Sequence, residues 1–380
     1  MTPRLYFLPF LLVPTLSPGF ASATSYNLVR DYSGATFFNG WKFYGAADNL
    51  TNGDANFVSQ SQASTLQLAY VDPNTQRAII KVDNSSVVAF NEKRNTVRIS
   101  TEDLYPVGSV WVADMHHVPF GCSVWPAWWS QAPGWPTGGE IDTFEGVNMV
   151  TQNQISLHTT TGCNQVNPVQ SSTQISSTNC SNLANQNQGC ITMDPDPKSY
   201  GQGFADAGGG VFVTEMAKSG VSIWFFSRAN VPSSLSASAS TVDTSTLGTP
   251  LANYPTGGCN IDQFFSPQSL ILDITLCGDF ARPTFNQTCS SLAKRDNSCY
   301  LDVVLGPPSG YDTAFFDIAY VRVYGSGGSG SSGNNGNQTS SSGGGQTGSS
   351  SGNSAIGLKH AQGVGSLVFM LAALQLVSSL

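Results

Sequence analysis

The sequence predicts an all-β fold, a sandwich of antiparallel strands. Short segments rich in valine, isoleucine and aromatic residues alternate with turn residues, and no long stretch has the 3.6-residue period of an amphipathic helix. Several of these segments are apolar on one face only, as a sheet with one solvated side requires. The expected strands include 77–82, 96–100, 109–113, 210–216, 220–226, 269–276 and 315–324.

The composition indicates an extracellular protein with an uncharged polar ligand. Charged residues make up 11% of the 380 residues, less than half of the usual share of about 25%, and the net charge is −8. Solubility therefore depends on hydroxyl and amide groups, which suits a sugar ligand. Because nucleic acid requires a basic surface and this sequence has no basic cluster, we expect no nucleic-acid partner.

Both ends of the sequence resemble targeting signals. Residues 1–23 combine one early charge, an apolar run and an Ala-Ser-Ala cleavage site, a pattern typical of a secretory signal peptide. Residues 354–380 hold small residues, a polar spacer and an apolar tail, which is typical of a removed glycolipid (GPI) anchor signal; a plain membrane helix is the alternative. The Gly/Ser/Asn-rich segment 326–353 is expected to be a disordered stalk. The folded domain is therefore expected at 24–325.

Eight cysteines lie within the expected folded domain. An even number in a secreted protein predicts disulfide bonds, and the absence of a C-x-x-C pair argues against a zinc site. The sequence does not determine their pairing, because eight cysteines allow 105 connectivities.

Three carboxylates fall within the six residues EIDTFE, which hold Glu140, Asp142 and Glu145. Strand-forming residues separate them, so we interpret the segment as a strand. Glu140 and Asp142 then share a face, whereas Glu145, five positions after Glu140, faces the opposite way. A β-bulge at Thr143–Phe144 absorbs one residue, returns Glu145 to the shared face and keeps the apolar side chains in the core.

The spacing of the two glutamates bears on the reaction that they can catalyse. Four effective residues span about 13 Å, and glutamates that lean together on a concave strand close this to about 5–6 Å, near the separation of about 5–5.5 Å in retaining glycosidases. One acid is then the nucleophile and another keeps its proton, because crowding raises the pKa of at least one. Asp142 lies between them, and the three titrate as a group. A calcium site and a solvated polar strand are the alternatives, although calcium usually takes its carboxylates from a glycine-containing loop.

Aromatic residues precede the acids. Four of the seven tryptophans lie in this region: Trp125, Trp128, Trp129 and Trp135. Indole rings stack on the C–H faces of pyranose rings, and their N–H groups bind hydroxyls. On a strand, Trp125 and Trp129 share a face and Trp128 takes the other, so we expect at least one of them in the core. His158, on the next expected strand, is a further candidate for substrate contact.

The segment resembles glycoside hydrolase family 16, specifically the fungal endo-1,3(4)-β-glucanases of the laminarinase type. The resemblance spans about 26–325 and rests on WPAWW (125–129), WPTGGEIDTFEGVN (135–148), NQISLHT (153–159), IWFF (223–226), GTPLANY (248–254) and CGDF (277–280). It implies a β-jelly-roll sandwich with a substrate cleft across its concave sheet. It also implies that Glu140 is the nucleophile, Asp142 its assistant and Glu145 the acid/base, with a β-1,3- or mixed-linkage glucan as substrate.

Two further motif residues, Asn148 and Phe280, join the candidate substrate contacts through this resemblance. The sequence departs from the family at two positions: Phe280 stands where tryptophan is usual, and Trp128 stands where phenylalanine is usual. Either change would alter glucan preference if the side chain lined a sugar subsite.

We therefore expect a secreted, monomeric, retaining endo-β-glucanase that binds β-glucan, needs no cofactor or metal, and reaches a membrane only through its anchor. A wall-remodelling transglycosylase is the second hypothesis, because it uses the same covalent intermediate. Relatives of that kind usually carry an unbulged E-x-D-x-E, which counts against it. A non-catalytic glucan-binding protein is the third, although such relatives usually lose the acids that are all present here.

Overall fold

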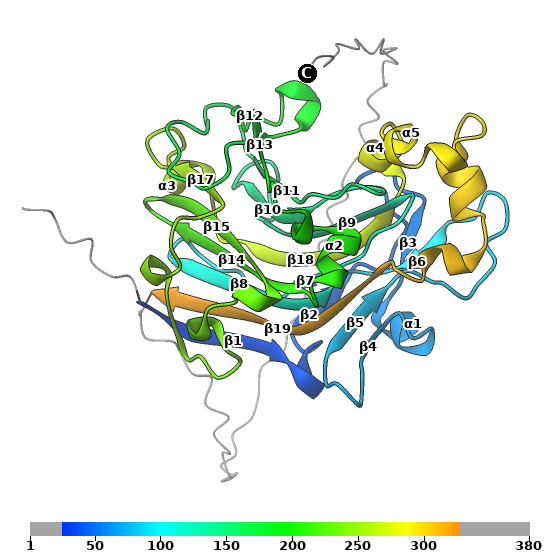
Figure 1. The fold of residues 1–380 in the computed structure, drawn as a ribbon, viewed down its shortest axis with the longest axis horizontal. Coiled ribbons are helices and arrows are strands. Elements are labelled where there is room, and N and C mark those ends of the chain that lie inside the picture. Colours follow the sequence, from blue (N-terminus) through cyan, green and yellow to red (C-terminus); the bar gives the residue numbers. More distant parts are fainter. Residues whose placement is uncertain (1–24, 327–380) are drawn as a thin grey trace, which may run out of the picture. The chain divides into compact units, whose positions relative to one another are not determined.

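The computed structural model describes residues 25–326, which form the folded domain drawn in Figure 1. The predicted signal peptide (1–23), anchor signal (354–380) and stalk (326–353) lie outside the described residues, apart from Ser326. That residue ends the last strand, which therefore continues past the expected end of the folded domain. Within the described residues, no helix is long and apolar enough to cross a membrane.

Two antiparallel sheets stack face to face, as the sequence predicts (Figure 1). The first sheet has nine strands, in the spatial order β16 (Thr241–Asp243), β1 (Ser25–Ser33), β19 (Phe315–Ser326), β8 (Ser109–His117), β14 (Gly210–Ala217), β15 (Gly220–Ser227) and β17 (Ala252–Pro255), with β5 (Ala78–Lys81) beside β19 and β4 (Ala69–Val71) beside β5. The second sheet has eight strands, in the order β12 (Ile175–Ser177), β13 (Cys190–Met193), β11 (Gln154–His158), β10 (Glu140–Glu145), β9 (Val124–Gln131), β18 (Ser269–Leu276), β7 (Arg98–Thr101) and β2 (Trp41–Phe43).

A small parallel pair, β3 (Ala55–Phe57) and β6 (Arg94–Thr96), lies apart from both sheets. The prediction of one strand over 96–100 is therefore wrong, because the chain changes partner between β6 and β7. Val97 between them is fully buried. The Thr96 hydroxyl donates to the carbonyl oxygen of Ile274 at 2.7 Å, which fixes the point where β6 ends.

The helices within residues 25–326 are short. The α-helices are α1 (Gln60–Thr65), α2 (Gly201–Asp206), α3 (Ile261–Phe264), α4 (Gly278–Ala281) and α5 (Phe285–Thr288), and a π-helical turn covers Cys299–Val304. Single 3₁₀ turns lie at Gly34–Thr36, Asn185–Asn187, Pro197–Ser199, Arg228–Asn230, Ser233–Leu235, Thr244–Thr246, Ser290–Leu292 and Pro308–Tyr311. In Figure 1, α4 and α5 stand on one side of β10 and β11, and β12 and β13 stand on the other.

The apolar core lies between the two sheets. The second sheet contributes fully buried side chains such as Trp128, Ile141 and Phe144, which meet Phe212 and Val321 of the first sheet. By alternation, the other face of the second sheet holds the polar side chains. The candidate catalytic residues lie on that face.

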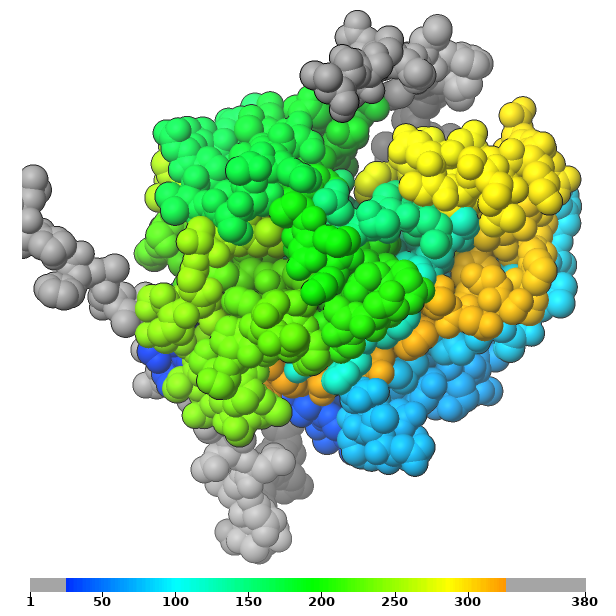
Figure 2. Space-filling model, in the orientation of Figure 1, coloured from blue at the N-terminus to red at the C-terminus, as the bar shows by residue number. Residues whose placement is uncertain are grey.

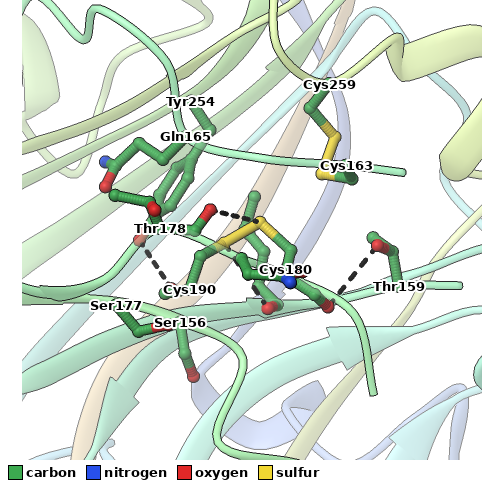
Figure 3. The surroundings of a disulfide bond; sticks show 12 residues. Ser156, Thr159, Cys163, Gln165, Ser177, Thr178, Cys180, Cys190, Tyr254 and Cys259 are labelled. Atoms are coloured by element: carbon green, nitrogen blue, oxygen red, sulfur yellow. Dashed lines mark hydrogen bonds between the residues drawn. A yellow bond between two sulfur atoms is a disulfide. The ribbon is translucent and has the colours of Figure 1, made fainter. Parts of the chain in front are cut away.

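All eight cysteines pair, as the sequence predicts: Cys122–Cys289, Cys163–Cys259, Cys180–Cys190 and Cys277–Cys299. The Cys180–Cys190 bond closes a short loop beside β11, and Figure 3 shows it close to Ser156 and Thr159. The Thr159 N–H donates to the carbonyl oxygen of Cys180 at 2.8 Å. This disulfide therefore supports the strand that presents His158.

Candidate active site

The bulge predicted in β10 is present at the expected position. Against β11, Asp142 pairs with Ser156 and Glu145 pairs with Gln154, so two residues of β10 oppose one of β11. Against β9, the register shifts between Asp142 and Phe144. The extra residue places Glu145 on the same face as Asp142, as the predicted bulge requires.

The residues of the bulge explain why it forms here. Phe144 is fully buried and stacks on Tyr200 at 5.2 Å, with 16° between the ring planes. The Thr143 side chain is also buried, and its hydroxyl lies 2.6 Å from the hydroxyl of Thr214 on β14. Both side chains thus face the core, and Gly146 permits the close approach of Tyr200, whose ring would lie 2.4 Å from a Cβ at that position.

Glu145 is half-buried, and both of its carboxylate oxygens accept hydrogen bonds. The indole N–H of Trp125 donates to Oε1 at 2.9 Å, and the amide of Gln154 donates to Oε2 at 3.2 Å. These donors come from β9 and β11, the two neighbours of β10. The carboxylate is therefore held from both sides on the polar face of the sheet.

Glu140, Asp142 and His158 form the second part of the cluster. One ligand atom from each lies within 4.8 Å of the others. Asp142 Oδ2 accepts from the Ser156 hydroxyl at 2.6 Å and lies 3.3 Å from His158 Nε2. The other ring nitrogen of His158 lies 3.4 Å from Asn187 Oδ1.

The cluster shifts the pKa of its members. Burial, followed by the negative charge of Asp142, raises the pKa of Glu145 to about 7, although the Trp125 hydrogen bond acts in the opposite direction. The same two causes raise the pKa of Glu140 well above its usual range, and His158 opposes them. Burial lowers the pKa of His158, but its hydrogen bond to Asp142 and the charge of Glu140 outweigh this and raise it to about 10. His158 is therefore a cation at neutral pH and offsets part of the negative charge.

The same three groups, Glu140, Asp142 and His158, have donor atoms that could hold a metal ion. A metal ligand must offer a neutral ring nitrogen, so a metal ion here would have to displace the proton that Asp142 and Glu140 favour on His158. Divalent oxygen-loving cations also prefer more oxygen ligands than the two carboxylates supply. The arrangement is better suited to proton transfer than to metal binding.

A row of side chains crosses the polar face from the acids to the edge of the sheet. Asp142 lies opposite Trp129, which lies opposite Ile271, and the row continues through Ser100 to Lys42 on β2. Four strand spacings make this row about 19 Å long. Ile271 within this row is buried, whereas Trp129 and Ser100 are partly exposed and Lys42 is exposed, and these three offer a surface beside the acids for a linear ligand.

Trp129 is half-buried in this row, as the alternation predicted. Its indole N–H donates to Asp273 at 2.7 Å, and the Arg98 guanidinium lies 4.8 Å from its ring centre. Asp273 also pairs with Arg98 at 3.4 Å. The indole is thus fixed in orientation, with the remaining ring surface available.

Two hollows lie along the second sheet, one beside the acids and one at its far edge. One, of about 90 Å³, lies next to Glu145 and is lined mainly by apolar and amide groups: Gly146, Val147, Val150, Gln152, Gln154, Met193, Phe280, Thr284, Gln287 and Thr288. The other, of about 240 Å³, lies at the sheet edge and is lined by Lys42, Phe43, Tyr44, Arg98 and Ser100. Figure 2 shows a notch between the green and yellow segments of the surface, which contribute to the lining of the first hollow.

The remaining aromatic candidates differ in position. Trp128 is fully buried, so its departure from the family pattern concerns the core and not a subsite. Trp135 is 40% exposed in the loop between β9 and β10. Phe280 lines the hollow beside Glu145 and packs edge-on against Trp125, with ring centres 5.6 Å apart.

The structure corrects the candidate Asn148. Its side chain is fully buried and both ends of its amide are used within the protein. The oxygen accepts from the Ser123 N–H, and the nitrogen donates to the Ala281 carbonyl oxygen, both at 2.9 Å. Asn148 therefore joins the start of β9 to α4 and is not positioned for substrate.

Several residues of the site were missed by sequence reasoning. Gln154 and Ser156 follow the same alternation as His158, so the period of β11 was a usable signal for both. Asp273 lies in an apolar strand that gave no reason to single it out. Asn153, which contacts the bulge, precedes β11; it begins the motif NQISLHT, but the motif did not indicate this role.

Comparison with known proteins places this geometry in a family. Residues 41–324 match the model described as the XgeA-like, catalytic GH16 domain. The chain belongs to glycoside hydrolase family 16. This GH16 domain is therefore a glycosidase domain, and the resemblance noted in the sequence is confirmed.

Its relatives include fungal proteins with related names. A probable glycosidase of Schizosaccharomyces pombe is 34% identical over 306 residues, covering 80% of this chain and 70% of that protein. An endo-1,3(4)-β-glucanase of Emericella nidulans is 34% identical over 317 residues, covering 82% of this chain and 49% of that protein. The chain thus spans about half the length of several of the curated relatives that it matches.

Solved structures agree with the fold. Laminarinase 16A from Phanerochaete chrysosporium, with β-glucans in its donor and acceptor sites, is 34% identical with a TM-score of 0.73, covering 79% of this chain and 99% of that one. An elongating GH family 16 β-1,3-glucosyltransferase is 32% identical with the same TM-score and coverage. Similar domains therefore include both a laminarinase and a glucosyltransferase.

Proposed function

We propose that this GH16 domain hydrolyses β-1,3- and mixed-linkage β-1,3(4)-glucans within the chain, with retention of configuration. The observation that carries the proposal is the bulge, because it brings Glu145 to the face that holds Glu140 and Asp142. Two carboxylic acids on one face are what double displacement requires. The relatives named endo-1,3(4)-β-glucanase support the substrate class.

Glu145 acts as the acid/base. Its pKa of about 7 lets it hold a proton in weakly acidic solution and donate that proton to the leaving glycosidic oxygen. The bonds from Trp125 and Gln154 fix the carboxyl group at the position where the proton is delivered. In the second step the ionised carboxylate accepts a proton from the attacking water.

Glu140 acts as the nucleophile and must be ionised to attack the anomeric carbon. Asp142 and burial oppose this, and the His158 cation favours it. Because Asp142 is held by Ser156 and His158, it stays close to Glu140. Attack forms a bond from a Glu140 oxygen to the anomeric carbon, and the bond to the leaving oxygen breaks.

The row from Asp142 to Lys42 and the hollow beside Glu145 support an endo mode of action. The glucan lies across the strands, with Trp125 and Trp129 available for stacking on sugar rings. A surface that extends on both sides of the acids accommodates the interior of a polymer, whereas a closed pocket accepts only a chain end. His158 and Phe280 border this path.

Digestion of laminarin and lichenan with product sizing tests the function. We expect both polymers to give short and intermediate oligosaccharides from the first minutes. Glu140→Gln is expected to abolish turnover of both. Unchanged turnover in that variant would remove the assigned nucleophile, and release of glucose alone would contradict the endo mode.

Glucosyl transfer is the second candidate, because the similar GH16 glucosyltransferase shares the fold and 32% of its sequence. Transfer uses the same glycosyl–Glu140 intermediate, with a sugar hydroxyl replacing water as the attacking group. Incubation with laminariheptaose and mass measurement distinguishes the two. Products longer than seven sugars indicate transfer, and exclusively shorter ones indicate hydrolysis.

We further infer that the protein is secreted and attached to the cell surface. The four disulfides support an oxidising compartment, and residues 1–23 and 354–380 carry the proposed signal peptide and GPI signal. Release of the protein from cells by a phosphatidylinositol-specific phospholipase is the expected result. Retention after this treatment, with release by detergent, indicates a membrane helix instead.

A further inference from the structure

Asn153 precedes β11 directly and closes the bulge of β10 with its side chain. Its Oδ1 accepts from the Glu145 N–H at 2.9 Å, and its Nδ2 donates to the Thr143 carbonyl oxygen at 2.9 Å. One amide therefore binds the backbone on both sides of the extra residue. In a regular sheet, the neighbouring strand's backbone would supply such partners.

The amide is itself fixed by its surroundings. Asn153 is fully buried, and its own N–H donates to the Ser199 hydroxyl at 3.0 Å. Its carbonyl oxygen accepts from the Asp194 N–H at 2.9 Å. All polar groups of this residue are thus occupied, and the side chain has a single orientation available.

We propose that Asn153 is a positioning residue that sets the direction of the Glu145 carboxyl group by clamping the bulge. This inference rests on the proposed acid/base role of Glu145. Without the amide, the Glu145 N–H and the Thr143 carbonyl oxygen lose their partners in a buried place, and unpaired buried backbone groups drive local rearrangement. The rearrangement turns Glu145 away from the Trp125 and Gln154 donors. Glu140 and Asp142 lie before the bulge, in the regularly paired half of β10, and keep their positions.

This placement predicts a loss confined to proton transfer. Laminarin has a poor leaving group that requires protonation, whereas 2,4-dinitrophenolate leaves without it. For Asn153→Ala we expect laminarin turnover to fall about 100-fold, the usual worth of general acid catalysis. The rate of the initial burst of dinitrophenol release from a 2,4-dinitrophenyl β-laminaribioside should change by less than about threefold.

Azide provides the second readout. It attacks the anomeric carbon of the glycosyl–Glu140 intermediate without base assistance, breaks the bond to the Glu140 oxygen and gives a β-configured glycosyl azide. Sodium azide should therefore accelerate turnover of the aryl glycoside by Asn153→Ala and yield this product. The wild-type protein should show no acceleration.

Asn148→Ala is the matched control. Asn148 is also a fully buried asparagine whose amide joins a backbone N–H to a backbone carbonyl oxygen, and it lies three residues after Glu145. We expect this variant to lose stability, with the ratio of laminarin to aryl-glycoside rates as in the wild type. A loss of stability alone therefore does not reproduce the Asn153 result.

Asn153→Asp is the alternative variant if Asn153→Ala does not fold. A neutral carboxyl group at this position accepts from the Glu145 N–H and donates to the Thr143 carbonyl oxygen, but the ionised form cannot donate. Its activity on laminarin should thus resemble the wild type in acid and be lost as the pH rises through the pKa of the introduced carboxyl group, while the rate on the aryl glycoside is retained. Equal loss on both substrates as the pH rises contradicts the proposal.

Glu145→Gln separates this proposal from the proposed function. One outcome is that Glu145→Gln shows the leaving-group dependence and azide rescue while Asn153→Ala loses activity equally on laminarin and on the aryl glycoside. That result would show that Asn153 has no positioning role. If Glu145→Gln itself shows neither effect, the acid/base assignment fails and the Asn153 proposal fails with it.

Discussion

The two halves of β10 are held in different ways. Glu140–Asp142 pairs regularly with β9 and β11, and its side chains alternate as in any strand. Thr143–Glu145 contains the bulge and depends on side chains: the Asn153 amide on one edge and the Thr143–Thr214 contact toward the core. Backbone pairing thus positions Glu140 and Asp142, the proposed nucleophile and its assistant, whereas specific buried side chains position Glu145, the proposed acid/base. The following variants test this contrast.

The largest effects are expected from the two glutamates themselves. Glu140→Gln should lower turnover of every substrate by at least about 10³-fold, because no other group can form the intermediate. Glu145→Gln should lower laminarin turnover by about 10²–10⁴-fold, as loss of a general acid does. Rates on laminarin and on an aryl glycoside with a dinitrophenyl leaving group distinguish the two. If both variants lose activity equally on both substrates, the two halves of β10 do not have the separate roles proposed here.

A substitution of His158 should affect Glu140, in the regularly paired half of β10. The His158 cation lowers the pKa of Glu140, so His158→Gln raises it further. The nucleophile must be ionised, and its activity is lost as pH falls through its pKa. The acid limb of the laminarin pH profile should therefore move to higher pH, by about one unit or more for loss of a neighbouring opposite charge. An acid limb that stays in place would show that the cation does not act on Glu140.

Trp125→Phe should affect Glu145, in the half of β10 that contains the bulge. The Trp125 hydrogen bond lowers the pKa of Glu145, so its loss raises that pKa above its present value of about 7. The acid then keeps its proton to higher pH, and the alkaline limb should move up by less than about one unit. Phe280→Leu, which alters the ring packed on Trp125, should leave that limb in place. If the alkaline limb of Trp125→Phe moves to lower pH instead, the hydrogen bond assigned between Trp125 and Glu145 is contradicted.

Thr143→Val should have the smallest effect on activity and a measurable one on stability. The variant keeps the shape of the side chain but leaves the buried Thr214 hydroxyl without its partner, which costs about 1–3 kcal/mol. Each kcal/mol corresponds to about 2–4 °C in Tm for a domain of this kind. The double variant Thr143→Val/Thr214→Val should recover most of the loss. No recovery, measured by calorimetry, would show that the hydroxyl pair does not hold the bulge.

Much of this arrangement followed from the sequence because it depends on local periodicity. Glu140, Asp142 and the core residue Ile141 follow strand alternation. The bulge was required because, without it, Phe144 would face solvent and Glu145 would face the core. The opposite faces of Trp128 and Trp129 followed in the same way. Asn153 and Asn148 did not follow, because their roles depend on which backbone groups remain unpaired after folding. An asparagine in a motif has the same appearance whether it binds a sugar or a backbone.

The split of the expected strand 96–100 has a similar cause. Its β propensity is uniform, but β6 pairs with β3 and β7 pairs with β18 and β2. The change of partner is decided by distant segments and leaves no local signal. The same is true of Asp273, whose bond to Trp129 exists only because β18 lies beside β9.

Trapping of the covalent intermediate tests the central claim most directly. A 2-deoxy-2-fluoro-β-laminaribiosyl fluoride should inactivate the protein with time, because the fluorine slows the second step more than the first. Peptide mass spectrometry is then expected to find the sugar on Glu140, in the regular half of β10. A sugar attached to Glu145, or turnover with no attached sugar and an inverted first product, would contradict the account.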